Sequence, residues 1–137
     1  MERALLLSLD QGTTSSRAAL YRATGERLLS RSAPLEATYP ADGWVEQRPE
    51  AIWCSQLEAM RALEEALTAE QRRAVAACGI TNQRETTVLW RHASDTPLGP
   101  AIVWQDGRTA PICARWKRQG LEPMIRRRTG LLVDPYF

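Results

Sequence analysis

The first cluster of residues that could do chemistry is the run 10–17, which contains an acid, a glycine and four consecutive hydroxyl side chains. Hydroxyls beside exposed turn amides suit phosphate oxygens, and Gly12 lets a ligand approach the main chain closely. The Asp10 carboxylate is placed to hold a divalent ion, through water, between the turn and a phosphate. The same residue types also build ordinary polar hairpins, so residue type alone leaves both interpretations open.

The second cluster is the adjacent pair Arg84 and Glu85. A guanidinium donates hydrogen bonds and a carboxylate accepts them, so together they can bind the hydroxyls of a polyol. Trp104 offers a flat apolar wall for a carbon chain, and Tyr136 offers a hydroxyl on an aromatic ring. Without further context, a surface ion pair of small energetic value is the favoured interpretation of Arg84 and Glu85.

The elements that must position these clusters follow from hydrophobic periodicity. Apolar runs on both sides of the first cluster predict a strand, a tight turn and a second strand, and residues 27–35 predict a third antiparallel strand. Residues 49–67 predict an amphipathic helix whose buried stripe consists of Trp53, Leu57, Met60, Leu63 and Leu67. The apolar run 74–80 predicts a buried strand parallel to the first. The second cluster follows this strand, at the edge where open α/β sheets bind ligands.

The remaining elements are a hairpin and two helices. Residues 87–91 and 101–104 predict a hairpin added to the core sheet, and residues 109–119 and 123–128 predict helices, the first ended by Gly120. The helices carry the one basic concentration of the chain, formed by Arg115, Lys117, Arg118, Arg126, Arg127 and Arg128. A solvated helix face is favoured over a nucleic-acid site.

Composition places the chain among ordinary globular proteins. It has 137 residues, room for one domain, and a net charge of +2, which gives no argument for a nucleic-acid or membrane partner. No apolar run approaches the ~20 residues of a membrane span, and the N-terminus lacks the design of a signal peptide. The three scattered cysteines fit free thiols in a reducing compartment. We therefore expect a cytoplasmic protein.

Several motifs, in the same order along the chain, resemble the FGGY carbohydrate kinases and their glycerol kinase branch. Residues 9–17 resemble the opening motif of the family, and residues 79–87 closely resemble a signature of that branch. Residues 104–109 resemble its Trp-x-Asp-x-Arg element, with Gly107 where arginine is common. Residues 134–137 are similar to the segment that brings a tyrosine to the substrate.

This resemblance implies a fold and a set of site residues. The fold would be α/β and ribonuclease H-like, as in the ATPase lobe of actin and hexokinase. Residues 1–137 would be the amino-terminal part of the FGGY kinase N-terminal domain, an incomplete lobe without the C-terminal domain. The resemblance implies ATP and Mg²⁺ as cofactors, with Asp10 at the metal. The nucleotide would be bound by Asp10, Thr13, Thr14, Ser15 and Arg17, and glycerol by Arg84, Glu85, Trp104 and Tyr136.

The activity that the resemblance implies is ATP-dependent phosphorylation of glycerol to glycerol 3-phosphate by a full-length homo-oligomer. The family's catalytic base lies beyond residue 137, so no catalytic residue is assigned and the isolated chain is expected to be inactive. Two alternatives stay open. One is another FGGY kinase, acting on a pentulose or similar polyol. The other is a non-catalytic remnant that binds a polyol or a partner chain.

Overall fold

The structure is a computed structural model that describes residues 4–137. The chain divides into two units, and each is described by itself. The first unit comprises the residues up to Glu36 together with Pro49–Gln83. The second comprises Ala37–Arg48 and Arg84–Phe137.

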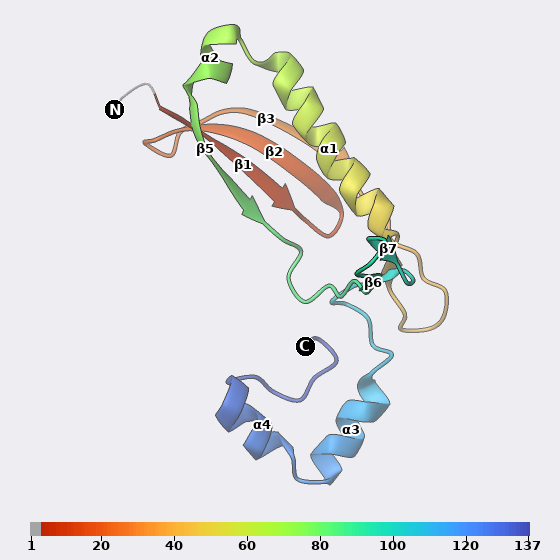
Figure 1. Cartoon of the computed structure of the whole chain (residues 1–137). Helices are drawn as coiled ribbons and strands as arrows, with labels where there is room; N and C mark the ends of the chain where they lie inside the picture. The colour runs from red at the N-terminus through yellow and green to blue at the C-terminus, as the bar shows by residue number, and fades with distance from the viewer. Residues whose placement is uncertain (1–3) are drawn as a thin grey trace. The chain divides into compact units, whose positions relative to one another are not determined.

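The first unit is built on a four-stranded mixed sheet with the order β3-β2-β1-β5. Strands β1 (Leu5–Gln11), β2 (Ser15–Arg22) and β3 (Arg27–Pro34) form an antiparallel meander. Strand β5 (Val75–Thr81) lies parallel to β1 (Figure 1). The predicted hairpin, the third strand and the parallel direction of β5 are therefore confirmed.

Helix α1 (Pro49–Ala66) lies across one face of this sheet, over β2 and β3 (Figure 1). Small side chains make the contact: Ala18 and Ala33 from the sheet pack with Ala59 and Leu63 from the helix. Because three of these four residues are alanines, the helix can approach the strands closely and exclude water from the space between them.

The predicted buried stripe of α1 is wrong for most of its residues, since only Leu63 is buried and Leu57, Met60 and Leu67 are half-buried. The buried residues of α1 are Ser55, Ala59 and Leu63, whereas Trp53 is 64% exposed. Sequence periodicity counted only large apolar side chains. The face that packs is set instead by small residues, since these allow the close approach to the alanines of the sheet.

The prediction that β5 is buried is also wrong within the first unit. Strand β5 is an edge of the sheet, and Ile80 near its end is 78% exposed. Helix α1 packs mainly on β2 and β3, so its cover does not extend to β5. The short helix α2 (Ala69–Ala74) precedes the strand and begins with a capping box of Thr68 and Gln71.

The second unit contains two small two-stranded sheets. Strand β4 (Glu46–Gln47) pairs with β8 (Ala101–Ile102), and β6 (Trp90–Arg91) pairs with β7 (Thr96–Pro97). The predicted hairpin of 87–91 with 101–104 is therefore wrong.

A local turn explains this correction. The chain reverses at residues 92–95, where Asp95 adopts a positive φ of 50°, so β6 pairs with the residues that immediately follow the turn. Only the bridge between Thr87 and Ile102 remains of the predicted pairing among the described residues.

Two helices follow in the second unit, α3 (Ala110–Arg118) and α4 (Glu122–Thr129), both as predicted. Gly120 has a φ of +71°, the left-handed conformation that suits a residue just after a helix. The six basic side chains of these helices are exposed, as expected for a solvated face. Between residues 4 and 137, no helix is both long and apolar enough to span a membrane.

Candidate functional site

The loop at the tip of β1 and β2 is tightly closed. The Gly12 amide donates to the Ser15 carbonyl at 3.0 Å, and the Leu35 amide donates to the Thr14 carbonyl at 2.9 Å. These bonds fix the loop at both of its ends. Thr14 is exposed, whereas Thr13 and Ser15 are half-buried.

Asp10 and Arg17 lie directly opposite each other on β1 and β2. Cross-strand partners share a face of the sheet, and neighbouring residues along a strand point to opposite faces. Ser16 contacts Ser55 of α1, so Asp10 and Arg17 lie on the face that α1 leaves open. A carboxylate and a guanidinium beside one tight loop suit a metal-bound phosphate.

Ser16 is a correction to the predicted row of phosphate-facing hydroxyls. It is fully buried, and its hydroxyl donates to Gln11 Oε1 at 3.0 Å and lies 2.6 Å from the Ser55 hydroxyl. A hydroxyl held in this way between the sheet and α1 cannot reach a phosphate. Its role is to satisfy a polar contact inside the core.

We expect Gly12→Ala to destabilise the protein, because an added Cβ would lie 2.7 Å from the Ser15 carbonyl oxygen. Overpacking against main chain should lower the free energy of unfolding by about 1–3 kcal/mol. Gly79→Ala in β5 is the matched control, since an added Cβ there meets nothing within 4 Å. Urea unfolding of both variants is the measurement, and an unchanged stability of Gly12→Ala would refute the steric account.

In the second unit, Arg84 and Glu85 form an exposed turn. Glu85 has a φ of 61°, in the left-handed region that residues other than glycine seldom occupy. Such backbone conformations persist only where the surrounding structure holds them, and they are found often at ligand-binding sites.

Hydrogen bonds tie this loop to the segment that carries Trp104. The Trp104 amide donates to the Thr86 hydroxyl at 3.3 Å, and Thr87 and Ile102 exchange both of their main-chain bonds at 2.9 Å. The Trp104 ring meets the Tyr136 ring edge to face, with centroids 5.3 Å apart. The structure therefore brings Trp104 together with Tyr136 and with the loop that follows Arg84 and Glu85.

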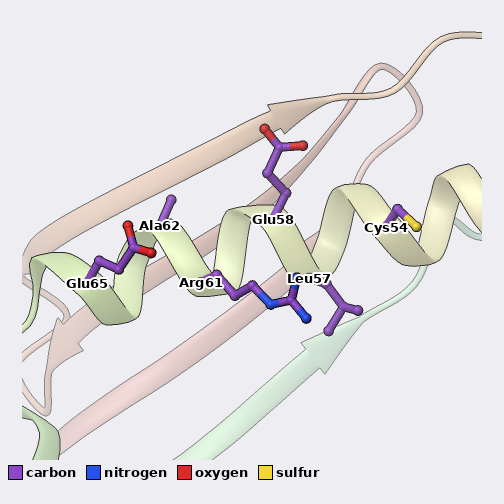
Figure 2. Close-up of a pocket in the computed structure, with 6 residues that line it drawn as sticks. All are labelled: Cys54, Leu57, Glu58, Arg61, Ala62 and Glu65. Carbon is purple, nitrogen blue, oxygen red and sulfur yellow. The ribbon is translucent and has the colours of Figure 1, made fainter.

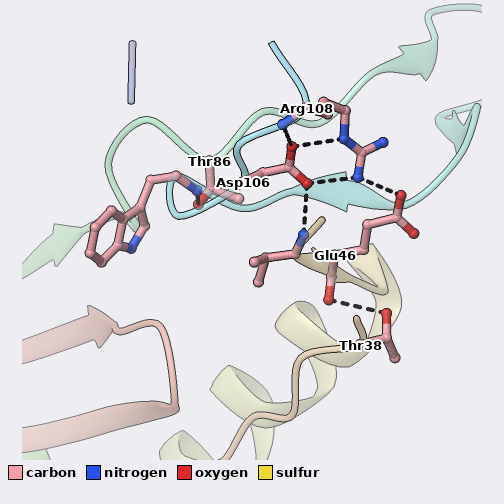
Figure 3. A network of polar contacts seen from close by, with 7 residues as sticks. Thr38, Glu46, Thr86, Asp106 and Arg108 are labelled. Atoms are coloured by element: carbon pink, nitrogen blue, oxygen red, sulfur yellow. Dashed lines mark hydrogen bonds and ion pairs between the residues drawn. The ribbon is translucent and has the colours of Figure 1, made fainter. Parts of the chain in front are cut away.

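Asp106, Arg108 and Glu46 form a polar network in the same unit, with Asp106 buried (Figure 3). The Arg108 guanidinium donates to both carboxylate oxygens of Asp106 at 2.8 Å and to Glu46 Oε1 at 2.7 Å. It also stacks on Trp44, with 3.8 Å between Cζ and the ring centroid. The Trp-x-Asp-x-Arg motif marks two of these residues. Nothing in the sequence pairs Glu46 with them, because it lies 62 positions from Arg108.

The network shifts the pKa of both partners. The hydrogen bond from Arg108 lowers the pKa of Asp106 to about 2, against an opposing effect of burial. The hydrogen bond to Asp106 raises the pKa of Arg108. Asp106 is thus ionised, and its ion pair intact, at any pH well above 4.

This pKa shift predicts an acid-sensitive contribution to stability. Because the folded pKa of Asp106 lies below its unfolded value, the contribution is complete above about pH 4 and is lost towards pH 2. We expect Asp106→Asn to have a lower free energy of unfolding than the unsubstituted protein at about pH 6. This difference, the stability gap, should narrow by roughly 1–2 kcal/mol at about pH 3. Urea midpoints at both pH values measure the gap, and a gap independent of pH would contradict the assignment.

Comparison with known proteins decides the family. Residues 5–137 match the FGGY family of carbohydrate kinases, N-terminal domain. The chain belongs to the FGGY family. A curated relative named glycerol kinase, from Citrifermentans bemidjiense, is 56% identical over 133 residues, which are 96% of this chain and 26% of the relative. The chain thus spans about a quarter of the length of the curated relatives it matches.

Solved FGGY structures share the fold. Plasmodium falciparum glycerol kinase with ADP matches with a TM-score of 0.83 and 28% identity, over 98% of this chain and 27% of that one. Xylulose kinase from Rhodospirillum rubrum matches with a TM-score of 0.88 and 25% identity, over 97% of this chain and 27% of that one. These similarities confirm the predicted α/β lobe of the actin and hexokinase type.

The metal that FGGY kinase chemistry implies has one candidate ligand in the hairpin. Within residues 4–137, no group of three or more His, Cys, Asp or Glu side chains could hold a metal ion. A single carboxylate is nevertheless compatible with Mg²⁺, which keeps several waters and takes its other oxygens from substrate phosphates. Asp10 is half-buried on the open face of the sheet and forms no side-chain hydrogen bond or ion pair with the described residues, so it fits that role.

The surface of α1 carries a hollow of about 420 Å³ that contains none of the predicted site residues (Figure 2). It is lined by Cys54, Leu57, Glu58, Arg61, Ala62 and Glu65. The hollow is open, and its two acids flank one arginine on the outer side of the helix. It therefore offers no enclosed site for chemistry.

Proposed function

We propose that this chain is the amino-terminal part of a kinase that transfers phosphate from ATP to glycerol, giving glycerol 3-phosphate. One observation carries the proposal: Trp104 contacts Tyr136 and is hydrogen-bonded to the loop that follows Arg84 and Glu85, within one unit of the fold. The 56% identity to a relative named glycerol kinase supports the same substrate.

On the polyol side, each residue has a separate role. The Arg84 guanidinium donates hydrogen bonds to substrate hydroxyl oxygens, and the Glu85 carboxylate accepts from substrate hydroxyl hydrogens. The Trp104 ring packs on the carbon chain, and the Tyr136 hydroxyl closes the set. A short triol has a hydroxyl on every carbon, so a donor, an acceptor and an apolar wall together orient it.

On the phosphate side, the hairpin of the first unit binds the nucleotide. Arg17 neutralises phosphate charge, and the hydroxyls of Thr13, Thr14 and Ser15 donate to phosphate oxygens. Asp10 would hold Mg²⁺, which when bound would supply neutralisation of the phosphate charge.

Proton removal from the reacting hydroxyl is the step that we assign to no residue of this chain. We propose that the base lies in the part of the kinase beyond residue 137, so residues 1–137 alone should release no ADP. The complete enzyme is further proposed to be a cytoplasmic homo-oligomer that binds no nucleic acid.

A full-length kinase for testing can be made by continuing this chain with the remaining part of the Citrifermentans bemidjiense relative. We expect this full-length kinase to prefer glycerol over xylulose, because the proposed set of Arg84, Glu85, Trp104 and Tyr136 supplies a donor, an acceptor and an apolar wall that suit a three-carbon polyol. Coupled ADP release gives kcat/KM for each substrate. An equal or higher value for xylulose would favour a pentulose kinase, and no turnover of either substrate would favour a non-catalytic remnant.

A further inference from the structure

The Asp106 carboxylate is saturated with hydrogen bonds. One oxygen accepts from the Val45 amide at 2.7 Å and from Arg108 Nη2 at 2.8 Å. The other accepts from the Arg108 amide and from Arg108 Nε, each at 2.8 Å. Since a carboxylate has about four acceptor positions, every one is used. This arrangement fixes both the side chain and the main chain of the motif.

The network is more shielded from water than the exposed ion pair of Arg22 and Glu26. The side chains of Arg108, Glu46 and Asp106 are 19%, 15% and 2% exposed. The pair of Arg22 and Glu26 is 48% and 62% exposed. Planar two-point binding of a carboxylate by a shielded guanidinium fixes orientation as well as distance.

Main-chain bonds carry this fixed geometry to Trp104. The Val103 amide donates to the Val45 carbonyl at 3.0 Å, and the Asp106 amide donates to the Val103 carbonyl at 2.8 Å. Trp104 therefore lies in a turn whose two ends, Val103 and Asp106, are both bonded to Val45. A third bond joins the Gly107 amide to the Gly43 carbonyl at 2.7 Å.

We propose that Asp106, Arg108 and Glu46 are positioning residues for the polyol site, which hold the Trp104 ring against Tyr136. They act through the turn of residues 103–106, whose two ends are bonded to Val45. This inference rests on the proposed function, because it assigns to Trp104 the apolar wall of that site. Its prediction is that loosening the network weakens the use of the polyol and leaves the use of ATP intact.

The test compares Arg108→Met with Arg22→Met in the full-length kinase. The first substitution removes the shielded guanidinium and keeps a long side chain, and the second removes an exposed one. We expect Arg108→Met to raise the glycerol KM about tenfold, with the ATP KM and kcat within about twofold of the unsubstituted values, and Arg22→Met to change none of them. Glu46→Gln, which retains one acceptor for Arg108, should give the same pattern with a smaller rise.

A second measurement does not depend on turnover. The Trp104 emission is the part of the fluorescence that Trp104→Phe removes, and its quenching by iodide reports the exposure of the Trp104 ring. We expect Arg108→Met to raise the quenching constant of this emission at least about twofold. Failure of the unsubstituted kinase to phosphorylate glycerol would overturn the proposed function, whereas the quenching would still decide the role of the network. For Arg108→Met, unchanged quenching or a parallel rise in both KM values would overturn the positioning role. The same effects at a smaller size in Glu46→Gln would support it.

Discussion

Asp10→Ala in the full-length kinase is expected to lower kcat by about a hundred- to a thousandfold, the range seen when one electrostatic stabiliser is removed from an active site. Asp10 is the only acid in the hairpin run 10–17, and it shares the open face of the sheet with Arg17. Without it, Mg²⁺ would lose the protein ligand that we propose beside the phosphates. The glycerol KM should change little, because the proposed polyol residues belong to the other unit.

The matched control is Glu26→Ala, which removes an exposed acid from the turn between β2 and β3 in the same unit. It should leave kcat unchanged. Raising the Mg²⁺ concentration should recover part of the activity of Asp10→Ala if the defect is weak metal binding. A kcat within about threefold of the unsubstituted enzyme would remove Asp10 from the metal site that we propose.

Arg84→Ala should instead damage glycerol use. Removing one partner of a hydrogen-bonded pair costs about 1–3 kcal/mol, so the glycerol KM should rise by about five- to 150-fold. Nucleotide affinity should stay as it was. Arg91→Ala is the matched control, since Arg91 is an exposed arginine in the same unit and outside the proposed site.

Steady-state kinetics with glycerol and ATP varied in turn separates these effects. A similar rise in both KM values for Arg84→Ala would mean that the site residues are not divided as proposed. So would a glycerol defect of equal size in Arg91→Ala.

The local elements of the fold were predictable because their signals are local. The meander of β1, β2 and β3 follows from short apolar runs separated by turns, and the cap of α2 follows from Thr68 and Gln71. The buried face of α1 was not predictable in the same way. It depends on Ala18 and Ala33, which lie on other elements and match Ala59 in size.

The residues of the candidate site differ in the same way between local and distant signals. Asp10, Arg84, Glu85, Trp104 and Tyr136 could be proposed from motifs, because the motifs are contiguous in sequence. Glu46 could not, since its partner Arg108 lies far along the chain and the two meet through long-range bonds such as the pairing of β4 with β8. The positive φ of Glu85 also leaves no mark in residue type.

Ligand binding without turnover tests the division of the two sites most directly. Calorimetry with ATP and Mg²⁺, and equilibrium dialysis with labelled glycerol, should be done on Asp10→Ala and Arg84→Ala of the full-length kinase. We predict that Asp10→Ala loses affinity for the nucleotide with Mg²⁺ and keeps its affinity for glycerol, and that Arg84→Ala does the opposite. Loss of both ligands in either variant, to an equal degree, would contradict the account.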